Sequence, residues 1–204
     1  MSYPGLDSAG NLKDQASLIK HLGYYFVCRY YNVNSPSKNL NSDEADELSF
    51  NDLYIVPVWE NGYPTSVSYF SKSKGKSDAQ NAINYAKNTI MQPLNTPIYF
   101  AVDYDATDSD ISNAILPYFN GISDAMDAAD DPYYIGVYGS GAVCSYIYKN
   151  VARVYYTWLS KSTKWRGYDI FTTWDIKQGD SFFFNNIPCD KDDSIYSNGT
   201  GFKL

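Results

Sequence analysis

Histidine and cysteine are almost missing from this chain of 204 residues. The one histidine, His21, has no serine or cysteine motif near it, so a Ser-His-Asp triad is not expected and a histidine-rich zinc site is excluded. Cys28, Cys144 and Cys189 are odd in number and widely spaced, which favours neither a disulfide framework nor a Cys-x-x-Cys metal site. We therefore expect three buried thiols and no bound metal or cofactor.

Long apolar runs are also absent, and the 16 basic residues are outnumbered by 23 acidic ones. No run approaches the roughly 20 apolar residues that a membrane-spanning helix needs, and residues 1–5 lack the segments of a secretory signal peptide. The sequence therefore predicts a soluble protein with no signal peptide on this chain. A net charge of −7 argues against a nucleic-acid partner, because binding to phosphate backbones depends on clustered Lys and Arg. The Lys-rich stretch 72–76 is expected to be a solvated loop.

Aromatic residues, by contrast, are abundant: they make up 17% of the chain, with 21 Tyr and 4 Trp. A core of this size does not need so many, so some are expected to be partly exposed. Flat rings with a polar edge cover sugar faces well, although a tyrosine-rich surface can equally bind a protein. Of the two, the composition favours a carbohydrate partner.

Short β-branched and aromatic runs alternate with amphipathic helical stretches over the first two thirds of the chain. This alternation is typical of βα units around a parallel sheet, and it stops near residue 152. We predict one domain, residues 1–204, with an α/β fold: an irregular TIM-like β/α barrel of five βα units followed by three strands. The expected strands are Tyr3 to Asp7, Tyr24 to Tyr30, Leu53 to Glu60, Ile98 to Asp103, Tyr133 to Tyr138, Val154 to Leu159, Ile170 to Asp175 and Ile187 to Asp190.

Carboxylates gather at the ends of these expected strands, where the loops of a parallel barrel face a common mouth. Asp7 ends the first strand, Glu60 the third and Asp103 the fourth, and Asp105 follows two residues later. On an extended backbone residues two apart share a face, so Asp103 and Asp105 are expected to form a carboxylate pair suited to acid–base work. The alternatives are a divalent-cation site and aspartates that only cap turns. A further acidic group, Asp190, Asp192 and Asp193, is expected to follow the eighth strand.

Other residues near the expected mouth have a binding and a structural interpretation. Arg29 could hold a carboxylate of the site or ligand in a forked contact, or form a rim salt bridge. Tyr138, Trp158 and Trp174 end the fifth to seventh expected strands and could be stacking walls or core residues. The glycines at 136, 139 and 141 do not follow a dinucleotide fingerprint and are interpreted as tight-turn residues.

The stretch Ile98-Tyr-Phe-Ala-Val-Asp-Tyr-Asp105 resembles the fourth-strand motif of the glycoside-hydrolase-like domains once grouped as domain-of-unknown-function family 1906. The resemblance covers nearly the whole chain. Further matching pieces follow in order: Gly5-Leu-Asp7, Cys28-Arg-Tyr-Tyr31, Lys38-Asn-Leu with Glu44, Pro57-Val-Trp-Glu60, Gly75 with Asp78-Ala79, Gly136-Val-Tyr-Gly139, and Trp174 with Gln178.

These domains are similar to the family 25 lysozymes, which cleave peptidoglycan with acids at the ends of strands one, four and eight. The resemblance implies such roles for Asp7, Asp103, Asp105 and one acid within residues 190–193. The chain departs from the lysozyme pattern, which carries Asp-x-Glu where this sequence has Asp103-Tyr-Asp105. Either Glu60 supplies the proton, or a different bond is cleaved, or catalysis has been lost.

The leading hypothesis is a glycoside hydrolase acting on a β-linked amino-sugar polymer such as peptidoglycan. The alternative is a non-catalytic carbohydrate-binding or cell-wall-targeting module on the same barrel, and a third interpretation is the lytic part of a toxin or phage protein. We expect a monomer in an extracellular or wall-associated setting. Asp103, Asp105 and Glu60 would share the acid and base work and Asp7 would position water or substrate; the expected substrate-binding residues are Arg29, Tyr138, Trp158, Trp174, Gln178 and Asp190.

Overall fold

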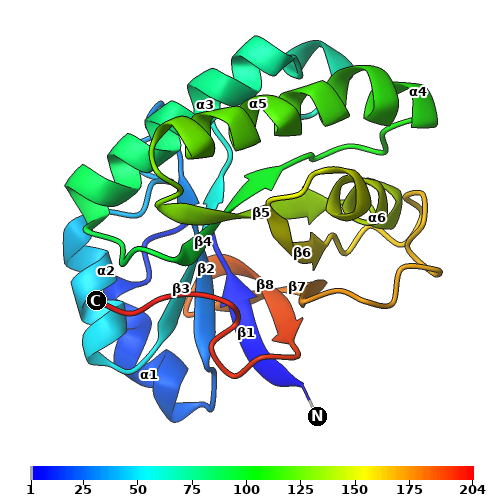
Figure 1. Cartoon of the computed structure of the whole chain (residues 1–204). Helices are drawn as coiled ribbons and strands as arrows, with labels where there is room; N and C mark the ends of the chain where they lie inside the picture. Colours follow the sequence, from blue (N-terminus) through cyan, green and yellow to red (C-terminus); the bar gives the residue numbers. More distant parts are fainter. Residues whose placement is uncertain (1) are drawn as a thin grey trace.

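The computed structural model, which describes residues 2–204, is a closed barrel of eight strands that neighbour one another in chain order (Figure 1). Strands β1 to β7 run parallel to one another, whereas β8 runs antiparallel to both of its neighbours, β7 and β1. The strands are β1 (Tyr3–Asp7), β2 (Phe26–Tyr31), β3 (Tyr54–Trp59), β4 (Thr96–Ala101), β5 (Tyr133–Gly139), β6 (Val154–Leu159), β7 (Ile176–Phe184) and β8 (Ile187–Ser194).

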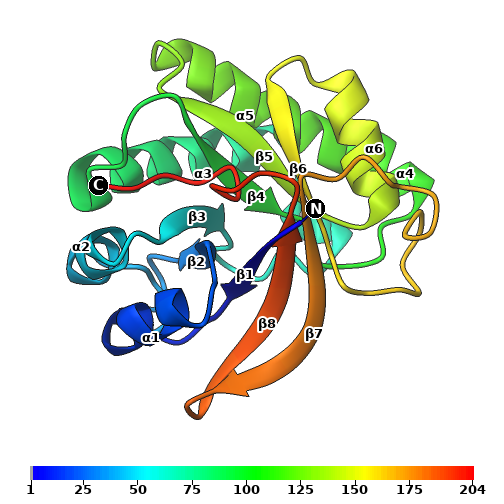
Figure 2. The ribbon, with the colours of Figure 1, turned by 90° about the horizontal axis from the view of Figure 1, so that it is seen from below.

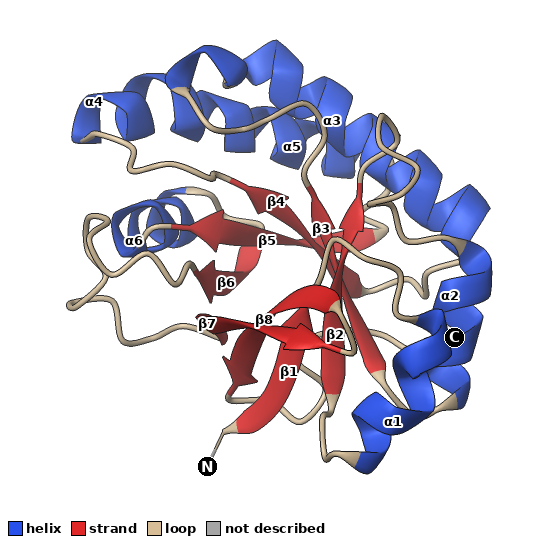
Figure 3. Cartoon of the chain, turned by 180° about the vertical axis from the view of Figure 1, so that it is seen from behind, coloured by secondary structure: helices blue, strands red, loops and turns tan. Residues whose placement is uncertain are grey.

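Helices follow each of the first five strands and form an arc around one side of the barrel (Figure 3). Within residues 2–204 no helix follows β6, β7 or β8, so the predicted order of five βα units and three closing strands is confirmed. The π-helical turns continue α3 and join α4 to α5. The helices are α1 (Ala16–His21), α2 (Ser42–Phe50), α3 (Lys72–Tyr85), α4 (Asp108–Asp110), α5 (Leu116–Ala128) and α6 (Gly141–Asn150), with 3-10 turns η1 (Lys13–Gln15) and η2 (Val67–Tyr69) and π turns η3 (Ala86–Ile90) and η4 (Ile111–Ile115).

Two elements differ from the sequence prediction. The seventh strand was expected at residues 170–175, but that segment is a loop in which Ile170 is 84% exposed, and β7 begins at Ile176. The prediction was wrong because β7 carries Gly179-Asp180-Ser181, a turn-like triplet that the structure accommodates as an irregularity in its pairing with β8. The Lys-rich stretch 72–76 is the first turn of α3 rather than a loop, with the Ser71 side chain accepting a hydrogen bond from the Lys74 amide.

Hydrophobic side chains form two layers, one inside the barrel and one between the barrel and its helices. The inner layer is small: Phe26, Cys28, Val56, Val58, Tyr99, Ala101, Trp158 and Ile176. Its large rings need space, and two inward-facing glycines supply it. A Cβ on Gly136 would come within 2.5 Å of the Tyr99 ring, and one on Gly5 would collide with Phe26.

The amino-terminal end of the barrel is closed by the last residues of the chain, which cross beneath it (Figure 2). Phe202 exchanges two backbone hydrogen bonds with Ile55, at 2.7 and 2.9 Å. The Thr200 hydroxyl lies 2.7 Å from the buried hydroxyl of Tyr99 inside the barrel. The mouth of the barrel is therefore at the opposite end, where it is formed by side chains at the carboxyl ends of the strands.

Candidate functional site

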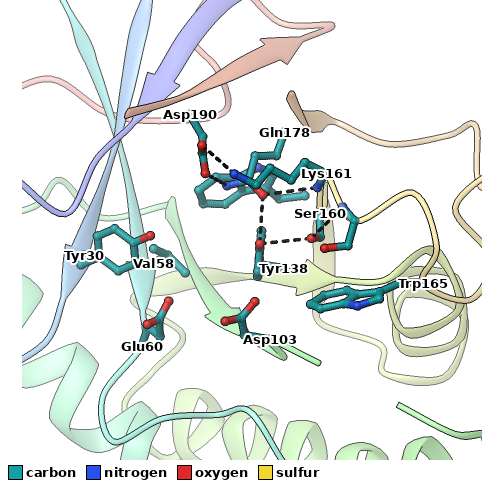
Figure 4. Close-up of a pocket in the computed structure, with 12 residues that line it drawn as sticks. Tyr30, Val58, Glu60, Asp103, Tyr138, Ser160, Lys161, Trp165, Gln178 and Asp190 are labelled. Atoms are coloured by element: carbon teal, nitrogen blue, oxygen red, sulfur yellow. Dashed lines mark hydrogen bonds and ion pairs between the residues drawn. The ribbon is translucent and has the colours of Figure 1, made fainter. Parts of the chain in front are cut away.

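A cavity of about 290 Å³ lies at this mouth, where the parallel strands end (Figure 4). Most of its wall continues the period of two that places side chains inside the barrel: Cys28 is followed by Tyr30, Val58 by Glu60, and Ala101 by Asp103. The lining residues are Tyr30, Val58, Glu60, Asp103, Tyr138, Trp158, Ser160, Lys161, Ser162, Trp165, Gln178 and Asp190.

Two carboxyl groups, Glu60 and Asp103, point into the cavity from one side (Figure 4). Glu60 is held by Lys38, whose Nζ lies 2.6 Å from Glu60 Oε1. Burial raises the pKa of Glu60, and the Lys38 ammonium opposes part of that rise. Asp103 differs, because within residues 2–204 its side chain has no hydrogen bond or ion pair, and burial raises its pKa. Asp103 is thus a partly buried carboxyl group that is free to meet a ligand.

The opposite side of the cavity is a hydrogen-bonded network centred on Gln178. The Gln178 Nε2 atom donates to Asp7 Oδ2 at 2.8 Å and to Asp190 Oδ2 at 3.2 Å, while its Oε1 accepts from the Tyr138 hydroxyl at 3.0 Å. Lys161 Nζ lies 2.7 Å from Asp190 Oδ1 and completes the network. These contacts fix the side chains before any ligand arrives, which is what a preorganised site requires.

Below the network lie two neighbouring buried carboxyl groups, Asp7 and Asp192. Asp192 accepts a hydrogen bond from Trp158 Nε1 at 2.9 Å. Burial raises the pKa of Asp192 well above its usual range, and the nearby charge of Asp7 raises it further. Burial also raises the pKa of Asp7, to about 7, although Gln178 lowers it. Asp7 is 4% exposed and reaches the mouth cavity through Gln178.

Aromatic rings supply flat surfaces around these polar groups. Trp158 is 2% exposed and forms part of the floor, with Tyr138 edge-on at a ring-centre distance of 4.9 Å. Trp165, from the loop after β6, turns its ring toward the opening (Figure 4). Tyr30 lines the far side, and its ring lies 4.0 Å from Lys38 Nζ. The cavity therefore combines carboxyl groups with ring faces.

Besides Asp7, three of the predicted site residues lie outside the cavity. Arg29 points away from the barrel interior, is fully buried, and pairs with Glu44 of α2 through Nε to Oε1 at 2.7 Å and Nη2 to Oε2 at 3.0 Å. Asp105 is exposed and accepts a hydrogen bond from the Arg166 amide at 2.8 Å. Trp174 is partly buried and packs against the main hydrophobic core. The expectation that Asp103 and Asp105 share a strand face was wrong, because β4 ends at Ala101.

The acidic group 190–193 lies within β8 and not after it. Because β8 runs antiparallel to β1, Asp190 is paired with Asp7 at the mouth, and Asp192 is paired with Gly5 one step deeper. Asp193 faces outward, where it accepts from Ser2 Oγ at 3.0 Å.

Several residues at the site were not predicted from the sequence, among them the lining residues Tyr30, Lys161 and Trp165, and Lys38, which pairs with Glu60. The alternation along β2 could have found Tyr30, because it lies two residues after the inward-facing Cys28. No periodic signal marks Lys161 and Trp165, which belong to a loop. Residues 2–204 contain no group of three or more His, Cys, Asp and Glu side chains arranged to hold a metal ion. In the same part of the chain, no helix has the length and apolar character needed to cross a bilayer.

The family model described as "Rv2525c-like, glycoside hydrolase-like domain" matches residues 17–189, most of the chain. This chain belongs to that family. The resemblance inferred from the sequence motifs is therefore confirmed. A Bacillus subtilis (strain 168) protein, FadG, is 37% identical over 141 residues, which cover 67% of this chain. The match is only 24% of FadG, so this chain spans about a quarter of that relative's length.

Solved structures share the fold of this Rv2525c-like domain. The Tat-secreted protein Rv2525c of Mycobacterium tuberculosis, in complex with L-tartrate, superposes with a TM-score of 0.79 at 20% identity, covering 95% of this chain and 96% of that one. The modular autolysin LytC of Streptococcus pneumoniae, in complex with a synthetic peptidoglycan ligand, gives 0.65 at 17% identity over 94% and 46%. A family 25 glycosyl hydrolase from Bacillus anthracis gives 0.56 at 10% identity over 95% and 89%. The TIM-like barrel is thus shared with an autolysin and a family 25 glycosyl hydrolase, whereas the activity of this domain has to be argued from its own site.

Proposed function

We propose that this domain binds a polymer containing amino sugars, such as peptidoglycan, in the mouth cavity and hydrolyses its glycosidic linkage. The observation that carries the proposal is Asp103, a carboxyl group that faces the cavity and has no partner among residues 2–204. The wall of the cavity also holds Glu60, the second carboxylate that glycoside hydrolysis needs. The family relationship and the fold shared with peptidoglycan hydrolases support the same conclusion.

Asp103 is the residue that we assign as proton donor. Burial raises its pKa, which keeps more of the carboxyl group protonated at a given pH than in an exposed aspartate. The proton passes to the glycosidic oxygen as the bond to the sugar breaks, and water supplies the new hydroxyl group. Glu60, held in place by Lys38, is the carboxylate that takes the balancing role, as base or as nucleophile. Asp190, Gln178 and Asp7 position the sugar or the water.

The choice of a carbohydrate rests on the rest of the wall. Tyr138 and Trp165 offer ring faces for a sugar, and Gln178 and Ser160 offer amide and hydroxyl groups for its hydroxyls. Two similar structures, an autolysin with a bound peptidoglycan ligand and a Tat-secreted protein, favour a cell-wall substrate and an extracellular setting. We also propose that the domain acts as a monomer.

Replacing Asp103 and Glu60 by their amides tests the assignment. Asp103→Asn is expected to lower the release of reducing ends from purified peptidoglycan by about a hundredfold or more, with binding to the insoluble polymer retained. Asp105→Asn is the matched control, because Asp105 is exposed and lies outside the cavity, and it should release sugar at the wild-type rate. A fully active Asp103→Asn variant would contradict the assignment.

A non-catalytic carbohydrate-binding module is the second candidate, and one observation favours it. Of the four carboxylates predicted to be catalytic, Asp105 faces away from the cavity and Asp7 is buried beneath Gln178. Only Glu60 and Asp103 remain in the cavity wall, and Glu60 is ion-paired. Retention of the wild-type protein on peptidoglycan with no release of reducing ends, over a range of pH, would decide for this module.

A further inference from the structure

Trp165 lies in the loop between β6 and β7, residues 160–175, all of which the structure describes and none of which belongs to a helix or strand. A loop of this length is usually mobile unless contacts fix it. The Trp165 ring nevertheless forms part of the cavity wall (Figure 4). The position of the ring therefore depends on what holds the backbone of this segment, the Trp165 loop.

The backbone of Trp165 itself is bonded only within the loop. Its amide donates to the Ser162 carbonyl at 2.9 Å, and its carbonyl accepts from the Tyr168 amide at 3.3 Å. These bonds shape the loop locally, but they do not connect it to the rest of the barrel. The connection has to come from neighbouring residues.

Arg166, the next residue, ties the loop to two other parts of the chain. Its carbonyl accepts from the amide of Ala142, in the first turn of α6, at 2.9 Å. Its amide donates to Oδ1 of Asp105 at 2.8 Å, a bond that the charge of the carboxylate strengthens. The Arg166 guanidinium adds little, because it lies 3.6 Å from Asp108, whose side chain is 95% exposed.

Asp105 belongs to the same short segment as the proposed proton donor. β4 ends at Ala101. Beyond it, Asp103 faces the cavity and Asp105 faces the Trp165 loop. The Asp103 amide donates to the Pro64 carbonyl at 2.9 Å, which fixes the start of the segment. One segment therefore carries both the carboxyl group that meets the ligand and the carboxylate that holds an aromatic ring of the same cavity wall.

We propose that Asp105 is a positioning residue: its carboxylate holds the Trp165 loop in place, so that the Trp165 ring stands at the mouth as a preformed stacking surface for a sugar. A fixed ring loses little conformational entropy when the sugar arrives, whereas a ring on a loose loop has to be ordered by the ligand, which weakens binding. Asp105 takes no part in bond cleavage. This inference rests on the proposed carbohydrate site.

Two variants of Asp105 separate its hydrogen bond from the rest of the side chain. Asp105→Ala removes the acceptor, whereas Asp105→Asn keeps an oxygen that can accept from the Arg166 amide and is the matched control. Fluorine NMR of protein carrying fluorotryptophan reports on the four tryptophans, and the Trp165 signal is the one lost in Trp165→Phe. Asp105→Ala is expected to shift or broaden that signal alone, and Asp105→Asn should leave all four unchanged. A Trp165 signal that does not respond to Asp105→Ala would overturn the proposal.

Binding to insoluble peptidoglycan tests the consequence, in an Asp103→Asn background so that the polymer is not consumed. Asp105→Ala is expected to weaken binding about fivefold, and Asp105→Asn should bind as the background protein does. With Trp165→Ala also present, Asp105→Ala should cause no further loss, because Asp105 acts through the ring. An equal loss with and without the Trp165 ring would mean that Asp105 acts by another route, and the positioning role would be wrong.

The two measurements separate this inference from the proposed function. If protein with unaltered Asp105 and Trp165 does not bind the polymer, the proposed carbohydrate site fails, and the role of Trp165 as a sugar wall fails with it. If that protein binds but Asp105→Ala leaves the affinity unchanged, the carbohydrate site stands and the inference about Asp105 is overturned.

Discussion

Asp7 lies between the carboxyl group of Asp192 and the amide of Gln178, and these neighbours determine how its charge depends on pH. Burial raises the pKa of Asp7 to about 7, from the ordinary value of 3.8 for an aspartate. Between these two values the folded protein binds more protons than the unfolded chain. The contribution of Asp7 to the free energy of unfolding therefore falls as the pH rises from about 4 to about 7, by at most about 1.4 kcal/mol per pH unit for one proton.

Asp7→Asn is expected to flatten this dependence. The amide has no proton to lose in this range, and it can accept from Gln178 and still contact Asp192. Urea unfolding of both proteins at several pH values between 4.5 and 7 measures the two slopes. Asp180→Asn, at an exposed position of β7, should keep the wild-type slope. Parallel slopes for the wild type and Asp7→Asn would show that Asp7 does not titrate in the folded protein as described.

Arg29 illustrates which residue-scale features the sequence could predict. The alternation along β2 already distinguishes the inward-facing Cys28 and Tyr30 from Arg29, so its absence from the cavity follows from position alone. The partner of Arg29 is harder to predict from the sequence. Glu44 is 15 residues away on α2, and only the packing of that helix brings the two side chains together. By contrast, Asp7, Glu60 and Asp103 were predicted as site residues because they end strands. Glu60 and Asp103 do line the cavity.

At the scale of elements, α3 and α5 pack side by side with almost no space between their backbones (Figure 1). Gly75 of α3 lies against the Tyr118 carbonyl of α5, and Gly121 of α5 lies against the Lys72 carbonyl of α3. A Cβ at either glycine would collide with the facing backbone. The stripe of apolar residues in α3 was predictable, but the start of the helix at Lys72 was not, because its first turn is polar and is stabilised by this contact.

Gly75→Ala is expected to destabilise the protein by about 2 kcal/mol or more, as overpacking does. The direction is informative, because the same change at an exposed helical position would stabilise it by roughly 0.5–1 kcal/mol. Chemical denaturation measures the difference. Asn81→Ala, at an exposed position of the same helix, is the control and should change stability little. A stabilised Gly75→Ala variant would mean that the two helices can move apart at no cost.

For the whole molecule, the number and order of strands followed from the alternation of patterns, but the direction of β8 did not. Nothing in the residues of β8 distinguishes a parallel from an antiparallel strand, and its direction follows from the two-residue connection that makes β7 and β8 a hairpin. That reversal places Asp190 beside Asp7 at the mouth. The misplaced β7 hid this connection from the sequence, and with it the hairpin wall beside the site.

The barrel is open at one end only, because the chain closes the other, and Phe202 is the residue that tests this arrangement. Phe202 is 2% exposed and packs in the main core, while its backbone pairs with Ile55. Phe202→Ala should lower the free energy of unfolding by about 3–5 kcal/mol, whereas Leu204→Ala, at a residue that is 45% exposed, should have little effect. Because Phe202 and the mouth lie at opposite ends of the barrel, ligand affinity measured well below the melting temperature should stay at its wild-type value. A parallel loss of affinity would show that closing the far end also shapes the cavity.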